Sequence, residues 1–241
     1  MKNNFLYFFY LIVVLIGLTY YLKFHSYRYF PDFQIHIPNN FSVHGIDVSK
    51  HQGEINWKKV AQNNIDGVVL KFVFIKASEG GLLKDKRFNE NWIQSKENGF
   101  IRGAYHYFSP YASPEKQANN FLSVVNLESA DLPAVLDIEE FSGNKEEFRM
   151  KIKNWLDIVE KETKIKPIIY TNSDFIKNYL EQYFDDYPLW IAHYYEKKPN
   201  TNKNWYFWQH NDSGSVNGIK EKVDFNVFNG TFNELQSICR D

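Results

Sequence analysis

Short apolar or aromatic runs alternate with longer amphipathic segments from residue 43 onward. Runs of this length, rich in β-branched and aromatic residues, are typical of strands. They predict eight strands, at residues 43–49, 68–78, 101–108, 133–140, 166–172, 188–194, 205–210 and 223–230. Their regular spacing indicates one sheet-based domain.

The segments that follow the first five strands have a helical pattern. Residues 145–163 are the clearest case, because an apolar stripe runs along one face from Phe148 to Val159. The other four lie at residues 55–64, 87–99, 113–125 and 173–184. After the sixth strand the gaps are rich in Asn, Lys, Ser and Gly and show no apolar stripe. This order predicts an α/β fold, a TIM-like (β/α)5(β)3 barrel whose C-terminal third is poor in helices.

The N-terminal part of the chain has a different pattern. Residues 5–22 carry no charge, and a helix of that length rises about 27 Å, close to the thickness of a hydrocarbon core. No A-x-A-like cleavage site follows it, which favours an uncleaved signal anchor over residues 1–23. Residues 24–42 are polar and contain prolines, which favours a tether. The expected organisation is therefore anchor, tether and a barrel over residues 43–241.

Composition excludes several classes of protein. The 28 Lys and Arg residues nearly balance 29 Asp and Glu residues, for a net charge of -1, which argues against a nucleic-acid-binding surface. Cys239 is the one cysteine, so an intrachain disulfide and a cysteine metal cluster are both excluded. The seven histidines show no metal-ligand spacing. We expect no metal and no cofactor.

The sequence PAVLDIEE, residues 133–140, places carboxylates at the end of a buried strand. Carboxylates are costly to bury without compensation. Asp137 and Glu139 are two residues apart, so both side chains point to the same face of the strand. Barrel enzymes carry their chemistry at this end of the strands. The pair is therefore a candidate for the reaction centre.

Two other acids are expected to join this pair. Asp47 lies at the corresponding end of the first strand, and Asp224 lies in the last strand, which neighbours the first in a closed barrel. A cluster of acids suits a hard metal ion, or acid/base chemistry in which repulsion keeps one carboxyl protonated. Aromatic residues on the same strands, such as Tyr105 and Trp208, favour sugar cleavage over phosphate chemistry.

The segments GIDVSKHQGEINW, FIKASEG, GAYHYF, LPAVLDIEE, PIIYTN, LWIAHY, WQH and VDFNVF, in this order, resemble the glycoside hydrolase family 25 lysozymes. The resemblance covers residues 43 to 230. It implies the eight-stranded barrel, and hydrolysis of the β-1,4 bond from N-acetylmuramic acid to N-acetylglucosamine in peptidoglycan. The expected partners are thus peptidoglycan glycan strands, with membrane contact through residues 5–22. We expect a monomer whose barrel lies outside the cytoplasm, in the periplasm or at the cell surface.

The resemblance also implies roles for the four acids. Glu139 matches the family's proton donor to the leaving oxygen, and Asp137 matches the acid that orients the acetamido group or stabilises the charged intermediate. Asp47 and Asp224 match the other acids of the cleft. A direct nucleophile and a substrate-assisted route both remain open. We predict that Glu139 is protonated at rest because Asp137 and its neighbours repel its charge.

Five further side chains are candidates for substrate contact. Tyr107 and Tyr170 could form hydrogen bonds with sugar or acetamido groups, or simply pack in the barrel. Trp190 could form a stacking wall. Gln209 could reach a sugar hydroxyl or bond to the backbone, and Glu79 could line the cleft or cap a segment.

Three alternative functions remain. A chitinase-like barrel with a D-x-x-D-x-D-x-E strand would need acids where the chain has Val135 and Leu132. A catalytically inactive, membrane-tethered wall-binding module would not require a proton donor, yet all four acids are present. A metal-dependent hydrolase would be inhibited by EDTA.

Overall fold

The computed structural model describes residues 2–24, 26–180 and 182–241, and within the N-terminal helix it describes the side chains of residues 7–18. The barrel strands are β3 (His44–Val48), β5 (Val68–Glu79), β7 (Ile101–Tyr107), β8 (Val135–Asp137), β9 (Ile168–Asn172), β10 (Leu189–Ala192), β11 (Trp205–Gly214) and β12 (Val223–Phe228). Each pairs with the next, and β12 returns to β3, which closes the sheet. The predicted TIM-like barrel is confirmed.

Strand direction changes only at the closing strand. The pairings from β3 through β5, β7, β8, β9 and β10 to β11 are parallel, whereas β12 is antiparallel to both neighbours. The start of β12 therefore lies at the same end of the barrel as the carboxyl ends of the other seven strands. Asp224, the second residue of β12, pairs in register with Asp47 of β3.

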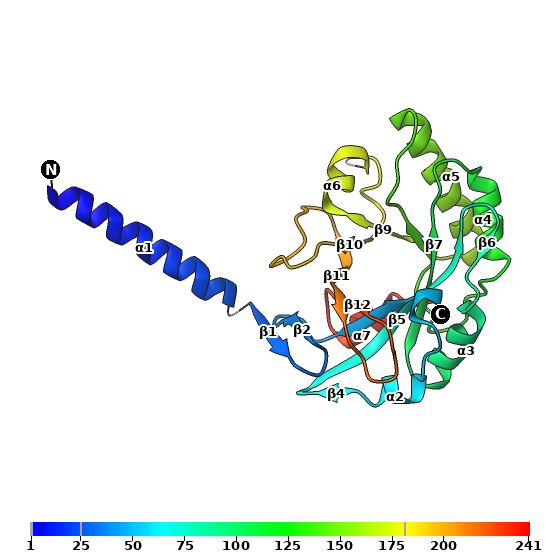
Figure 1. Cartoon of the computed structure of the whole chain (residues 1–241). Coiled ribbons are helices and arrows are strands. Elements are labelled where there is room, and N and C mark those ends of the chain that lie inside the picture. The colour runs from blue at the N-terminus through cyan, green and yellow to red at the C-terminus, as the bar shows by residue number, and fades with distance from the viewer. Residues whose placement is uncertain (1, 25, 181) are drawn as a thin grey trace.

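Helices follow the first five strands, as predicted. They are α2 (Trp57–Ala61), α3 (Phe88–Glu97), α4 (Pro114–Leu122), α5 (Lys145–Thr163), and α6 (Ser173–Phe175) continued by a π-helical turn (Ile176–Leu180). In Figure 1, α3, α4 and α5 cover the outside of the barrel beyond β5 and β7. The described connections between β10, β11 and β12 contain no helix, and α7 (Phe232–Ser237) follows the last strand. Short elements complete the fold: a 3₁₀ turn (Lys50–Gln52), β4 (Asn64–Ile65) and β6 (Leu83–Lys84).

Aromatic side chains fill the interior of the barrel below the acids. The ring of Phe74 stacks on Trp190 with centroids 4.3 Å apart, and Phe207 contacts both Phe72 and Phe74. Gly103 makes room for this layer, because a Cβ atom there would lie 2.5 Å from the Phe74 ring. The interior of the barrel is therefore a packed core.

Residues 27–38 differ from the predicted tether. They form an antiparallel hairpin of β1 (Tyr27–Phe30) and β2 (Ile35–Pro38), shown at the junction with the N-terminal helix in Figure 1. Phe33 is fully buried and its ring lies 5.1 Å from that of Phe225, while its carbonyl accepts a hydrogen bond from Ser215 N at 2.8 Å. The prediction was wrong here because these apolar residues cover the strands that lack helices.

The N-terminal helix α1 (Lys2–Phe24) extends away from the barrel in Figure 1. Within the described part of the chain, no helix has the length and apolarity required to cross a bilayer. The predicted membrane-spanning segment, residues 5–22, extends past both ends of the described side chains 7–18. The predicted transmembrane helix is thus not supported by the structure.

Candidate active site

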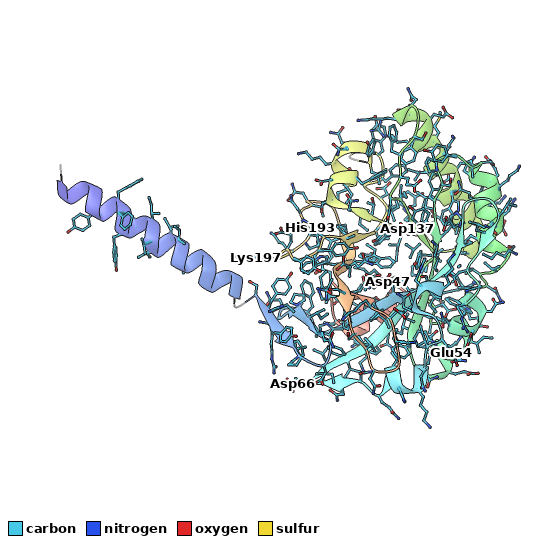
Figure 2. All side chains as sticks on the ribbon, in the orientation of Figure 1. Asp47, Glu54, Asp66, Asp137, His193 and Lys197 are labelled. Atoms are coloured by element: carbon cyan, nitrogen blue, oxygen red, sulfur yellow. The ribbon has the colours of Figure 1, made fainter. Side chains whose placement is uncertain are left out.

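The four predicted acids lie at the open end of the barrel. Asp137 is the last residue of β8 and Glu139 follows two residues later, while Asp47 and Asp224 come from the neighbouring strands β3 and β12. Figure 2 shows Asp47 and Asp137 within the body of the barrel. The acids lie close enough to interact, because the charge of Asp47 and that of Glu139 both raise the pKa of Asp137, and the charge of Glu139 also raises the pKa of Asp224. The structure therefore brings together all four acids.

Asp47 and Asp224 form a coupled pair. The two residues pair in register on neighbouring strands, so their carboxyl groups lie close together and titrate as a pair. Burial and then the Asp224 charge raise the pKa of Asp47 well above its usual range. Burial, followed by the charge of Asp212, raises the pKa of Asp224 to about 6. This is the arrangement in which two close carboxyls cannot both ionise.

Two amide side chains hold Asp47 in place. Gln209 Nε2 and Asn226 Nδ2 donate to Asp47 Oδ2 at 2.8 and 2.7 Å. Trp190 Nε1, which can only donate, bonds to Asn226 Oδ1 at 2.7 Å and so fixes the orientation of that amide.

The hydroxyl groups of two tyrosines complete this network. Tyr170 and Tyr194 each donate to Gln209 Oε1 at 2.7 Å, which directs Gln209 Nε2 toward Asp47. Gln209 is 3% exposed and all of these bonds are internal. Its predicted contact with a sugar hydroxyl is not supported, because its amide already orients Asp47.

Asp137 and Glu139 are less constrained. Asp137 is buried, and its Oδ1 atom has no hydrogen-bond partner among the described residues. Burial and then the Glu139 charge raise the pKa of Asp137 well above its usual range. Glu139 is exposed at the surface, although partial burial of its carboxyl raises its pKa. A buried acceptor without a donor is costly, so this oxygen is suited to a ligand N–H group.

The cause of the Glu139 shift differs from the prediction. After burial, Lys76 and the nearby Tyr170 hydroxyl lower the pKa of Glu139, and Glu140 raises it. Burial, and not the predicted repulsion by Asp137, is therefore the main cause of the raised Glu139 pKa, while repulsion between the two carboxyls raises the pKa of Asp137.

The other predicted contact residues have distinct surroundings. Trp190 is 1% exposed and its ring face is occupied by Phe74, so it packs in the interior and offers no stacking wall. Tyr107 donates to Glu140 Oε1 at 3.1 Å. Glu79 forms an ion pair with Lys76, with Nζ and Oε2 2.8 Å apart. Tyr107 and Glu79 both remain partly exposed.

An open cleft of about 420 Å³ adjoins Glu139. Its lining comes from the segment after β8, the ends of β9 and β10, the start of α6 and the loop after β10: Glu139, Tyr170, Asn172, Ser173, Asp174, Ala192, His193, Tyr194 and Asn200. The cleft is large enough for part of a sugar chain and reaches Glu139, the exposed member of the four acids. Within the described residues, no group of three or more His, Cys, Asp or Glu side chains is arranged to hold a metal ion.

Sequence analysis missed three residues of this site. Asn226 lies two residues after Asp224, so strand alternation would have placed both on the inner face. Lys76 is a cation in a mainly apolar part of β5, two residues after the interior Phe74. Tyr194 had no distinguishing signal, because it lies in a loop directly after β10.

Comparison with known proteins identifies the family to which this barrel belongs. The family model described as glycosyl hydrolases family 25 matches residues 46–219, which include Asp47, Asp137 and Glu139. The chain belongs to glycosyl hydrolase family 25. The resemblance inferred from the motifs is thereby confirmed, and the protein is a glycoside hydrolase.

Similar proteins match over most of the chain. The uncharacterized protein YegX of Escherichia coli K12 is 49% identical over 92% of this chain and 82% of its own length. Lysozyme M1 of Streptomyces globisporus is 32% identical over 83% of this chain and 72% of its own length. The structure of a family 25 glycosyl hydrolase from Bacillus anthracis superimposes with a TM-score of 0.77 at 27% identity, covering 85% of this chain and 97% of that one.

Proposed function

We propose that this family 25 glycoside hydrolase cuts the β-1,4 bond between N-acetylmuramic acid and N-acetylglucosamine in peptidoglycan. The observation that carries the proposal is the convergence of four carboxyl groups beside an open cleft, in a fold shared with lysozymes. Cleaving a glycosidic bond requires a proton for the leaving oxygen and negative charge near the developing oxocarbenium ion. The acid cluster contains groups suited to both tasks.

Glu139 is the proton donor in this proposal. Of the four acids it is the one that lines the cleft, and partial burial raises its pKa, which favours the protonated form needed for donation. Tyr170 lines the same cleft. Glu139 thus combines access to substrate with a proton to give.

Asp137 holds the substrate's acetamido group in this proposal. Its buried Oδ1 atom lacks a donor among the described residues, and the N–H of an acetamido group would provide one. Its negative charge also lies next to Glu139, where the positive charge develops during cleavage. The Asp47–Asp224 pair supports the floor of the site and keeps a further negative charge beneath it.

Mass analysis of released muropeptides tests this function. The full-length protein is expected to release fragments with new reducing ends on muramic acid. Glu139→Gln should lower the rate by about 10²–10⁴-fold, whereas the matched change Glu162→Gln, at an exposed position on α5, should keep it. New reducing ends on glucosamine would contradict the bond assignment, and full activity of Glu139→Gln would contradict the donor assignment.

We further propose that the barrel acts outside the cytoplasm, because peptidoglycan is found there. Protease added to intact spheroplasts tests the location. Digestion of the barrel supports it, and full protection until the cells are lysed contradicts it.

A further inference from the structure

Lys76 places a positive charge inside the acid cluster. It lies on β5 with its side chain largely buried, and its ammonium sits 4.7 Å from the centre of the Tyr107 ring. Tyr107 is the register partner of Asp137 on β8. The ammonium therefore lies beside the strand end that carries Asp137, and its ion pair with Glu79 at 2.8 Å anchors it there.

Apart from Lys76, few positively charged groups act on Asp137. Several titratable groups face it: Glu139 on its own segment, Lys76 and Glu79 on β5, Asp47 on β3, Tyr105 and Tyr107 on β7, and Tyr170 on β9. Of the charged groups that act on Asp137, Lys76 lowers its pKa, and Glu139, Asp47 and Glu79 raise it. Without a cation, burial and three negative neighbours would favour the neutral acid.

We propose that Lys76 is a positioning residue of the active site. Its ammonium favours the ionised form of Asp137 against the burial that favours the neutral acid, and its partner Glu79 weakens this effect. The proposal rests on the hydrolase function proposed above. An ionised Asp137 accepts a substrate N–H group more strongly than a neutral one. Lys76 also lowers the pKa of Glu139, so one cation acts on both groups.

The two partners of the ion pair should have opposite effects. Lys76→Met removes the charge that lowers the pKa of both Asp137 and Glu139, so both limbs of the pH–rate profile move to higher pH. Glu79→Gln removes a charge that raises the pKa of Asp137, so the acid limb moves to lower pH. A purely structural ion pair would give no such opposite shifts, because either substitution would simply loosen the same contact.

The experiment compares the full-length variants Lys76→Met, Lys76→Arg, Glu79→Gln and the matched control Lys71→Met. Lys71 is exposed on the same strand, so its removal changes the net charge equally. On the acid side of the wild-type optimum, kcat/KM of Lys76→Met should fall about tenfold relative to Lys71→Met. Lys76→Arg should keep the wild-type profile because it keeps the charge.

A second measurement does not depend on activity. In protein labelled with ¹³C at the aspartate carboxyl carbon, the Asp137 signal is the one missing from Asp137→Asn. Its titration should move to higher pH in Lys76→Met and to lower pH in Glu79→Gln, and should be unchanged in Lys71→Met. An Asp137 titration equal in wild type and Lys76→Met would overturn the assignment. If the wild type releases no muropeptides, the proposed function fails, and this titration still decides the role of Lys76.

Discussion

The two halves of the acid cluster differ in how much of their bonding the protein itself provides. Asp47 receives two amide N–H groups, and those amides are oriented in turn by Trp190 and by two tyrosines. Asp137 has a buried oxygen without a partner in the described chain, and Glu139 faces the cleft. The first half is built before any ligand arrives, whereas the second half is incomplete without one. Variants in the two halves should therefore affect different properties.

Asp137→Asn should give the largest effect on activity after Glu139→Gln. The amide keeps the shape of the carboxyl but removes its charge, so we expect muropeptide release to fall by about 10²–10³-fold. The free energy of unfolding at pH 7 should stay equal or increase, because a desolvated charge is removed. Rate assays and urea denaturation measure both quantities, with Asp157→Asn on the exposed face of α5 as the control. A marked loss of stability would show that Asp137, like Asp47, is held in place by the protein itself.

Asn226→Leu should have a large effect on stability. It leaves Trp190 Nε1 without an acceptor and Asp47 with one amide donor fewer. We expect the free energy of unfolding to fall by roughly 2–4 kcal/mol, measured by urea denaturation. Asn229→Ala, an exposed position after β12, is the matched control and should change little. Equal stability of the two variants would mean that the Asp47 half is not held by its amides.

Asp224→Asn should change how stability depends on pH. The pKa of Asp224 is raised to about 6 in the fold from 3.8, so the folded state binds more protons than the unfolded state between these values. Its contribution to stability therefore falls as pH rises through this window. Relative to wild type, the variant should gain roughly 2–4 °C in Tm between pH 4 and pH 7. A Tm difference that does not vary with pH would contradict the raised pKa.

Tyr194→Phe should have the smallest effect. It removes one of two hydroxyl donors to Gln209 and leaves the bond from Tyr170 in place. We expect a loss of about 0.5 kcal/mol in the free energy of unfolding, near the low end for one hydrogen bond. Tyr195→Phe, an exposed neighbour, serves as the control. A larger loss of unfolding free energy than that of Asn226→Leu would show that the network depends more on Gln209 than on Asn226.

Much of the barrel was predictable because strand alternation and helical periodicity are local patterns. The strand positions, the five helical segments and the helix-poor end all follow from them. The convergence of the acids also followed, since parallel strands bring their carboxyl ends together. The hairpin at residues 27–38 was missed, although Ile35 and Ile37 alternate with polar neighbours, because the prolines nearby favoured a tether.

The depth of a side chain within the barrel was not predictable. Trp190 and Gln209 lie on strands that supply the site, yet both are buried below or beside it. Depth depends on how neighbouring strands are staggered, which no single strand encodes. The effect of Lys76 on the acids was not predicted for a similar reason. Lys76 comes from β5, and it lies near the acids of β8 only in the closed sheet.

The hairpin that covers β11 and β12 determines where the chain can be shortened. A protein beginning at residue 43 would uncover Phe225 and Trp208, two side chains that are fully buried beneath residues 27–38 and the neighbouring Phe41. Aromatic groups newly in contact with water would promote self-association during purification. A recombinant fragment intended for crystals or assays should therefore start ahead of Tyr27.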